Sequence, residues 1–133
     1  ENELLVQTRR REGPERFIDQ YRSTDNGKTW TLEHEKLVDC AIGNPPALIK
    51  LNDGRLAMTY GYRGEPFSIR AVISEDNGKT WTEPITIRSG GSSQDIGYTR
   101  SLQRPDGKIV TTYYFSDKPT GHQRYIAASI WAP

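Results

Sequence analysis

The nine-residue stretch Ser23-Thr24-Asp25-Asn26-Gly27-Lys28-Thr29-Trp30-Thr31 occurs twice in this chain of 133 residues. The second copy, Ser74-Glu75-Asp76-Asn77-Gly78-Lys79-Thr80-Trp81-Thr82, starts 51 residues later and is identical at eight of the nine positions. Asp53-Gly54 and Asp106-Gly107 form another repeated pair, 53 residues apart. Two motifs at nearly one period indicate an internal repeat. A period of about 50 is typical of β-propeller blades, whereas helical repeats have roughly 33 to 47 residues.

The pattern around these repeats predicts short antiparallel strands and no helices. Asn-Gly and Asp-Gly between alternating apolar runs are strong hairpin signals, because type I′ turns need positive φ at both central positions. One period is expected to contain four strands, at residues 47–51, 55–60, 69–74 and 81–88. The same frame places strands before it at 4–8, 17–22 and 30–37, and after it at 100–103, 108–115 and 125–131.

The sequence therefore predicts an all-β fold built from propeller blades of four antiparallel strands. Residues 1–38 are expected to form a blade remnant, 39–90 a full blade and 91–133 a partial blade. This amounts to about two and a half blades, whereas a closed ring of six needs roughly 300 residues. We therefore expect a fragment, or one part of an assembly that further blades or self-association completes.

Composition excludes several classes of function. Lysine plus arginine number 18 and aspartate plus glutamate 17, and this near-balance argues against a nucleic-acid-binding protein. No apolar run approaches the ~20 residues of a membrane-spanning helix. A single cysteine, Cys40, rules out an internal disulfide framework. The chain begins at Glu1 without a signal peptide, which suggests a processed or excised piece.

The strand order predicts which end of the blades carries a binding site. In an up-and-down blade, the first and third turns lie at one end, so the repeated motifs share a face of tight turns. The opposite end receives the longer loops, where binding groups usually lie. These loops are expected at residues 9–16, 39–46, 62–67, 89–99 and 116–124. They are rich in arginine, which suggests an anionic ligand.

The repeated stretch matches the Asp-box, Ser-x-Asp-x-Gly-x-Thr-Trp, and the sequence resembles the sialidase (neuraminidase) superfamily, whose six-bladed propellers carry this motif. The box residues are expected to be structural: serine and aspartate bond the turn, glycine supplies positive φ, and tryptophan packs beneath. They are Ser23, Asp25, Gly27 and Trp30 in the first copy and Ser74, Asp76, Gly78 and Trp81 in the second. The motif lacks the ligands of a calcium loop, so we expect no metal and no cofactor.

The resemblance implies a retaining exo-glycosidase that removes a terminal acidic sugar from a glycan. Sialidases use a tyrosine nucleophile, which a glutamate activates, and bind the substrate carboxylate with three arginines. By position, Tyr98 is the candidate nucleophile, and Arg9 and Arg63 are candidate carboxylate ligands. The first arginine, the aspartate acid/base and the glutamate have no counterpart here, so we expect the 133 residues alone to be inactive.

Each of these assignments has an alternative. Arg10 and Arg11 compete with Arg9, Tyr98 could be a packed aromatic residue of the channel, and Arg63 could form a surface ion pair. Three further residues are possible site residues: Arg100, which departs from the sialidase pattern near the nucleophile, and Asp95 and His122, which could act as acid or base or be ordinary loop residues.

Two other classes of function compete with the sialidase hypothesis. One is a non-catalytic propeller module that binds glycan or protein, and the other is a propeller glycosidase or lyase of different specificity. The resemblance also suggests a secreted or periplasmic protein. The expected partners are a glycan and either further blades or another copy of the chain, with no nucleic acid and no membrane span.

Overall fold

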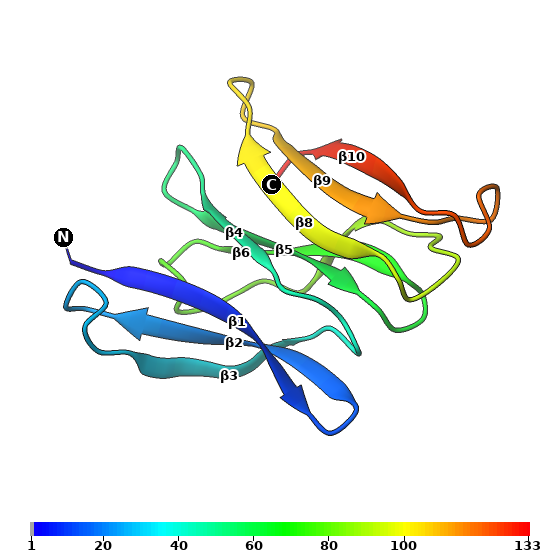
Figure 1. Cartoon of the computed structure of the whole chain (residues 1–133). Helices are drawn as coiled ribbons and strands as arrows, with labels where there is room; N and C mark the ends of the chain where they lie inside the picture. The colour runs from blue at the N-terminus through cyan, green and yellow to red at the C-terminus, as the bar shows by residue number, and fades with distance from the viewer. Residues whose placement is uncertain (1) are drawn as a thin grey trace.

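The computed structural model describes residues 2–133, in which there are ten β-strands and no helix, and hence no helix that could cross a membrane. The strands form three antiparallel sheets that lie side by side like blades (Figure 1). The first sheet contains β1 (Leu4–Glu12), β2 (Glu15–Ser23) and β3 (Thr31–Asp39). The second contains β4 (Ala47–Lys50), β5 (Leu56–Tyr62), β6 (Ser68–Ser74) and β7 (Ile85–Arg88). The third contains β8 (Gly97–Gln103), β9 (Ile109–Phe115) and β10 (Tyr125–Trp131).

Within each sheet, every strand pairs with the strand that precedes or follows it in the chain. The orders are β1-β2-β3, β4-β5-β6-β7 and β8-β9-β10. The middle sheet is a four-stranded propeller blade, and three strands of a blade lie on each side of it. The prediction of an all-β propeller fold is therefore confirmed, and all ten strands lie where the sequence places them, with changes at some of their ends.

The largest change concerns residues 9–16, which were expected to form a loop and instead form the end of a long hairpin. β1 and β2 pair without interruption from Leu4 opposite Ser23 to Glu12 opposite Glu15, so only Gly13 and Pro14 make the turn. Charged residues can continue a strand where both faces reach solvent, and here Arg10 is held by ion pairs with Glu12 and Glu35.

Two strand starts also differ from the prediction. β7 begins at Ile85 rather than at residue 81, because Pro84 has no N–H to donate to a ladder. β8 begins at Gly97, three residues earlier than expected, and its pairing with β9 is irregular between Gly97 and Arg100. This β-bulge moves Tyr98 from the predicted loop into the strand.

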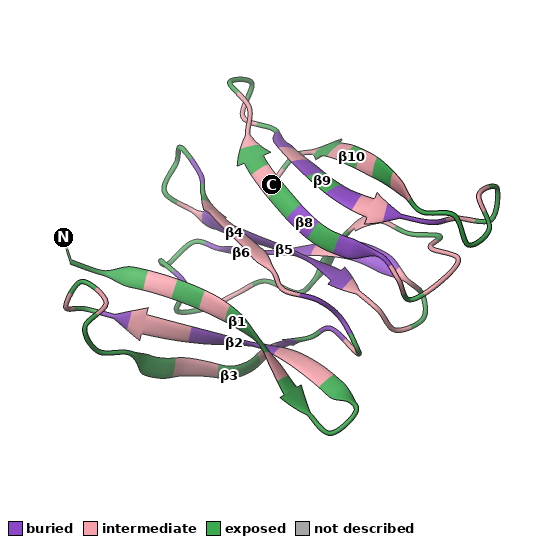
Figure 2. Cartoon of the chain, in the orientation of Figure 1, coloured by how far each residue is buried: buried purple, intermediate pink, exposed green. Residues whose placement is uncertain are grey.

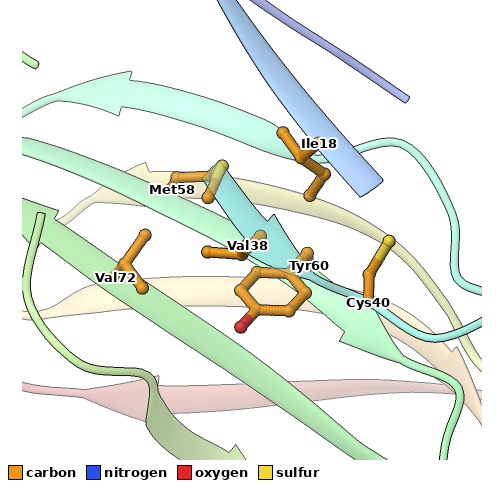
Figure 3. Close-up of a cluster of buried hydrophobic side chains, with 6 residues drawn as sticks. All are labelled: Ile18, Val38, Cys40, Met58, Tyr60 and Val72. Atoms are coloured by element: carbon orange, nitrogen blue, oxygen red, sulfur yellow. The ribbon is translucent and has the colours of Figure 1, made fainter. Parts of the chain in front are cut away.

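The core lies on both sides of the middle sheet (Figure 2), where purple marks the buried residues. Between the first two sheets, Figure 3 shows a cluster formed by Ile18, Val38, Cys40, Met58, Tyr60 and Val72. Burial raises the pKa of the Cys40 thiol to about 11, so this cysteine is a neutral packing residue rather than a nucleophile. Between the second and third sheets, Thr99 Oγ1 donates to the Thr59 carbonyl at 2.9 Å.

Each repeated stretch forms a closed turn. In the first copy, Asp25 accepts hydrogen bonds from the backbone N–H of Thr29 at 2.9 Å and from its hydroxyl at 2.7 Å, while Ser23 Oγ accepts from Gly27 N–H at 2.8 Å. The second copy repeats these bonds with Asp76, Thr80, Ser74 and Gly78. The bonds from the threonine lower the pKa of each aspartate to about 2, so both carboxylates are ionised at neutral pH.

The two tryptophans of the repeat have different surroundings. Trp81 packs against the core cluster between the first two sheets. Trp30 is 41% exposed, and its Nε1 donates to the Gly27 carbonyl at 3.1 Å. In the second copy the Gly78 carbonyl is instead bound by Gln20 and His34 of the first sheet. The repeated turn therefore also ties two sheets together.

The outer faces of the first and third sheets each carry a row of apolar side chains. On the third sheet, Leu102, Val110 and Ile130 lie in one cross-strand row, and Ile126 beyond them is 80% exposed. On the first sheet, Val6, Tyr21 and Leu32 lie in a similar row. Exposed apolar patches on sheets usually mark contact surfaces.

Candidate functional site

The loops that carry most of the predicted site residues lie at the end of the sheets opposite the repeated turns (Figure 1). The segments that meet at this end are the β1–β2 turn and the loops at residues 40–46, 63–67, 89–96 and 116–124. They are closely connected. Arg63 N–H donates to the Cys40 carbonyl at 3.2 Å, and Ser92 N–H donates to the Ser116 carbonyl at 2.9 Å.

Arg63 lies directly after β5 and connects the second sheet to the third. Its Nε donates to the Ile96 carbonyl at 3.0 Å, and its Nη2 donates to the Tyr114 hydroxyl. The same nitrogen lies 3.6 Å from Asp95 Oδ1. The guanidinium is therefore fixed in orientation, with its side chain only 17% exposed.

Asp95 is the acidic member of this cluster. It accepts a hydrogen bond from the Tyr114 hydroxyl at 2.7 Å and forms ion pairs with Arg63 and with Arg124, which comes from the loop before β10. The Tyr114 bond and the two guanidiniums hold the pKa of Asp95 below its ordinary value. The cluster thus contains two positive groups and one negative group, which leaves a net positive charge.

Tyr98 extends from this cluster toward solvent. Its ring is 48% exposed and stacks on the Tyr114 ring with centroids 5.8 Å apart, and the Arg63 guanidinium lies 5.9 Å from its centroid. The Tyr98 backbone has a φ of 51°, a conformation that costs about 1–3 kcal/mol for a residue other than glycine. Backbone strain of this kind and β-bulges both concentrate at functional sites.

Asn44 supports this arrangement from below and is fully buried. Its Nδ2 donates to the Ile96 carbonyl at 2.7 Å, and its Oδ1 accepts from Gly61 N–H at 3.2 Å. The Ile96 carbonyl is also the acceptor for Arg63 Nε. The buried Asn44 amide therefore joins β5 to the residue before β8, and Arg63 shares its Ile96 acceptor. These bonds fix the backbone position from which Tyr98 extends.

The pleat of β1 separates the three consecutive arginines that the sequence left as alternatives. Arg10 lies on the same face as Phe17 and Asp19 and pairs with Glu12, Asp19 and Glu35. Arg9 lies on the opposite face with Ile18, which packs against the second sheet. The positive charge of Arg9 acts to lower the pKa of the Cys40 thiol, but the opposite effect of burial is larger. The Cys40 carbonyl in turn accepts the hydrogen bond from Arg63 N–H.

The structure therefore brings together three of the predicted residues, Arg63, Tyr98 and Asp95. Arg9 lies at the same end but outside this cluster. Arg100 lies on the exposed side of β8, two residues from Tyr98, and its Nη1 donates to the Thr99 carbonyl at 2.8 Å. His122 lies on the exposed loop between β9 and β10.

Sequence reasoning missed Tyr114 and Asn44. A signal for Tyr114 was present, because the hairpin centred on Asp106-Gly107 pairs Gln103 with Ile109, and a regular register continued from there would place residue 98 opposite 114. The β-bulge shifts this pairing by one residue, so that Gly97 lies opposite Tyr114. Asn44 stands before two prolines, and no local pattern points to its partner Ile96, 52 residues later. A cleft of about 780 Å³ lies among the loops of the same end, lined by residues 65–67, 90–92 and 117–119, and no residue of the cluster lines it.

Comparison with known proteins gives a family and several relatives. Residues 1–111 match the model of the BNR repeat-like domain. A sialidase from Clostridium perfringens is 26% identical over 139 aligned positions, which cover 84% of this chain and 36% of that protein.

Solved structures share the fold. A protein of unknown function from Dyadobacter fermentans superposes with a TM-score of 0.76 and 29% identity, over 96% of this chain and 34% of its own. An α-L-arabinanase from Penicillium chrysogenum, solved with arabinobiose, superposes with a TM-score of 0.74 and 20% identity, over 97% of this chain and 42% of its own. The chain thus spans between about a third and two fifths of the length of these relatives. It is a member of the BNR repeat-like domain family, within the sialidase-like superfamily that its repeats predict.

Proposed function

We propose that this chain forms part of the active-site end of a sialidase-like exo-glycosidase. The reaction is the hydrolysis of a terminal acidic sugar of the sialic acid class from a glycan, with retention at the anomeric carbon. Tyr98 is the nucleophile, and Arg9 and Arg63 bind the substrate carboxylate. A secreted or periplasmic location belongs to the same proposal.

The observation that carries the proposal is the conformation of Tyr98. A strained backbone and a β-bulge expose a phenol above an oriented guanidinium, at the end of the blades where the loops meet. A tyrosine that served only for packing would not need positive φ or an exposed ring. A phenol needs a neighbouring base in order to attack, and in residues 2–133 no hydrogen bond to the Tyr98 hydroxyl is present, so that base comes from elsewhere in the enzyme.

The electrostatics of the cluster support an anionic substrate. Arg63 and Arg124 share the single carboxylate of Asp95, so a substrate carboxylate adds the missing negative charge. Because its pKa is lowered, Asp95 is ionised and acts as a counter-ion that orients Arg63 rather than as a general acid.

A second candidate is an exo-glycosidase that cleaves a neutral sugar. The observation that favours it is that Arg63 already has three partners, Ile96, Tyr114 and Asp95, so this arginine is largely satisfied without a substrate. The likeness in fold to an arabinanase is consistent with this candidate.

The experiment that tests the proposal compares two fluorogenic substrates with the enzyme that contains this chain. We expect release from an α-linked sialoside and no release from an α-L-arabinofuranoside, with the α-anomer of the free sugar appearing first by NMR. Hydrolysis of the arabinofuranoside alone would favour the second candidate, and hydrolysis of neither compound would favour a binding module.

We further propose that the outer faces of the first and third sheets are covered, either by further blades or by another copy of the chain. The 133 residues alone are then expected to associate, with a mass at least about twice that of the monomer by light scattering, because Ile126 and Ile130 are exposed beside a free strand edge. The double variant Ile126→Lys, Ile130→Lys should shift the chain toward the monomer. A monodisperse wild-type monomer would contradict this proposal.

A further inference from the structure

Three arginines share one face of the β1–β2 hairpin, close to its turn. Arg11 is paired directly with Arg16 across the two strands, and Arg9 is the next residue of β1 on the same face. Because residues two apart in a strand are about 7 Å apart, the three guanidiniums can all reach one small region. This region is called the hairpin arginine cluster below.

Within the part of the chain that the structure describes, the hairpin arginine cluster has no acidic partner. Among residues 2–133, none of the ion pairs includes Arg9, Arg11 or Arg16. Near the turn, the acids lie on the other face, where Arg10 pairs with Glu12, Asp19 and Glu35 and where Lys36 pairs with Glu12. The acids on the face of the cluster, Glu3 and Glu33, lie at the far end of the hairpin and pair with Arg22. The alternation of the strand therefore sorts the charges close to the turn, with neutralised groups on one face and positive charge alone on the other.

This arrangement is unfavourable in the absence of an anion. Like charges that lie directly opposite each other destabilise a pair of strands. Burial, together with the charges of Arg11 and Arg9, lowers the pKa of Arg16, which is the direction expected for crowded cations.

Two of the three arginines, Arg11 and Arg16, are nevertheless held in place instead of spreading apart. Arg16 Nη1 donates to the carbonyls of Gly13, Pro14 and Glu15 at 3.2, 3.1 and 2.8 Å, and Arg11 Nε donates to the Gly13 carbonyl at 3.2 Å. The Arg16 backbone is tied to the next loop, because its N–H donates to the Ala41 carbonyl at 2.6 Å. Nη1 and Nη2 of Arg11 and Nη2 of Arg16 keep free donors within the described part of the chain. A bidentate anion fits such preorganised guanidiniums.

We propose that the hairpin arginine cluster is a subsite for a second anionic group of the glycan, a sulfate ester or a carboxylate on the sugar next to the one that is cleaved. This inference rests on the proposed function and names the substrate class more closely: the preferred glycan carries two negative groups. Arg9 takes the carboxylate of the terminal sugar, and the Arg11–Arg16 pair, one step further along the strand, takes the second group. The two residues determine specificity and touch no reacting atom.

The test measures binding by calorimetry, so it needs no turnover. Three disaccharides are compared, each with the same acidic terminal sugar. They differ only in the second sugar, which carries a sulfate, a carboxylate or a hydroxyl group. We expect the wild-type protein to bind at least one of the two anionic ligands about 10-fold more tightly than the neutral one, and this preference to weaken with added salt. Arg11→Gln and Arg16→Gln should each remove most of the preference, whereas Arg11→Lys should keep part of it.

Arg104→Gln is the matched control, since it removes the same charge at the opposite end of the sheets, and its preference should equal that of the wild type. A preference for the sulfated ligand only, or for the carboxylated ligand only, supports the subsite and identifies the group that it binds. Equal affinity for all three ligands would overturn the subsite, as would equal losses in Arg11→Gln and Arg104→Gln. If the sialoside assay fails while the preference and its loss persist, the proposed hydrolysis is wrong and the anion subsite stands.

Discussion

Substitution of Gly97 by alanine is expected to destabilise the protein by about 4 kcal/mol or more, a large part of the 5–15 kcal/mol that is typical of a folded domain. The added Cβ would lie 2.2 Å from Asn44 Nδ2 and 2.6 Å from Asn44 Oδ1. Asn44 is fully buried and cannot move without losing its bonds to Ile96 and Gly61, and each buried group left unsatisfied costs about 1–3 kcal/mol. The φ of 118° at Gly97 adds strain for any residue with a side chain.

Gly107→Ala is the matched control for this effect. Gly107 also has positive φ, at 83°, but a Cβ there would meet no atom within 4 Å. Its substitution should therefore cost only the backbone strain, about 1–2 kcal/mol. Urea unfolding followed by circular dichroism measures both losses. Similar losses in the two variants would contradict the role of Asn44, and so would a loss in the double variant Asn44→Ala, Gly97→Ala that equals the sum of the single losses.

The fold could be predicted from the sequence because its turns depend on local chemistry. Asp25 and Asp76 bind groups within four residues along the chain, and Gly54 and Gly107 supply positive φ to hairpins that also set the register of the strands beside them. Such interactions recur wherever the same residues recur. The period, the number of strands and the assignment of the loops to one end all follow from them.

The candidate site was harder to predict from the sequence, because its contacts join residues that are far apart in the chain. Asn44 binds a carbonyl 52 residues later, and Arg63 binds a hydroxyl 51 residues later, so neither partner is visible in a local pattern. The hairpin at residues 9–16 was missed for a related reason. A run of arginine and glutamate has the composition of a loop, and only the pairing with β2 and the ion pairs of Arg10 stabilise it as a strand.

Tyr98→Phe should lower kcat of the sialidase-like enzyme by about 10³-fold or more, because it removes the nucleophilic oxygen. The substitution should leave the fold and substrate binding nearly unchanged. The phenyl ring can keep the stack on Tyr114, and the Tyr98 hydroxyl takes part in no hydrogen bond among residues 2–133. KM for the sialoside is therefore expected to change less than about threefold, as for a group that acts only in the transition state.

Two further variants separate the nucleophile from its surroundings. Tyr114→Phe keeps the stacked ring but removes the hydroxyl that joins Arg63 to Asp95, so it should lower kcat/KM by about 10-fold, through the position of Arg63. Tyr113→Phe removes a hydroxyl on the other face of β9, where Tyr113 bonds Ser129, and should leave kinetics unchanged. If Tyr98→Phe kept kcat within about 10-fold of the wild type, another group would be the nucleophile, since no neighbouring oxygen can replace a phenol at the same point in space.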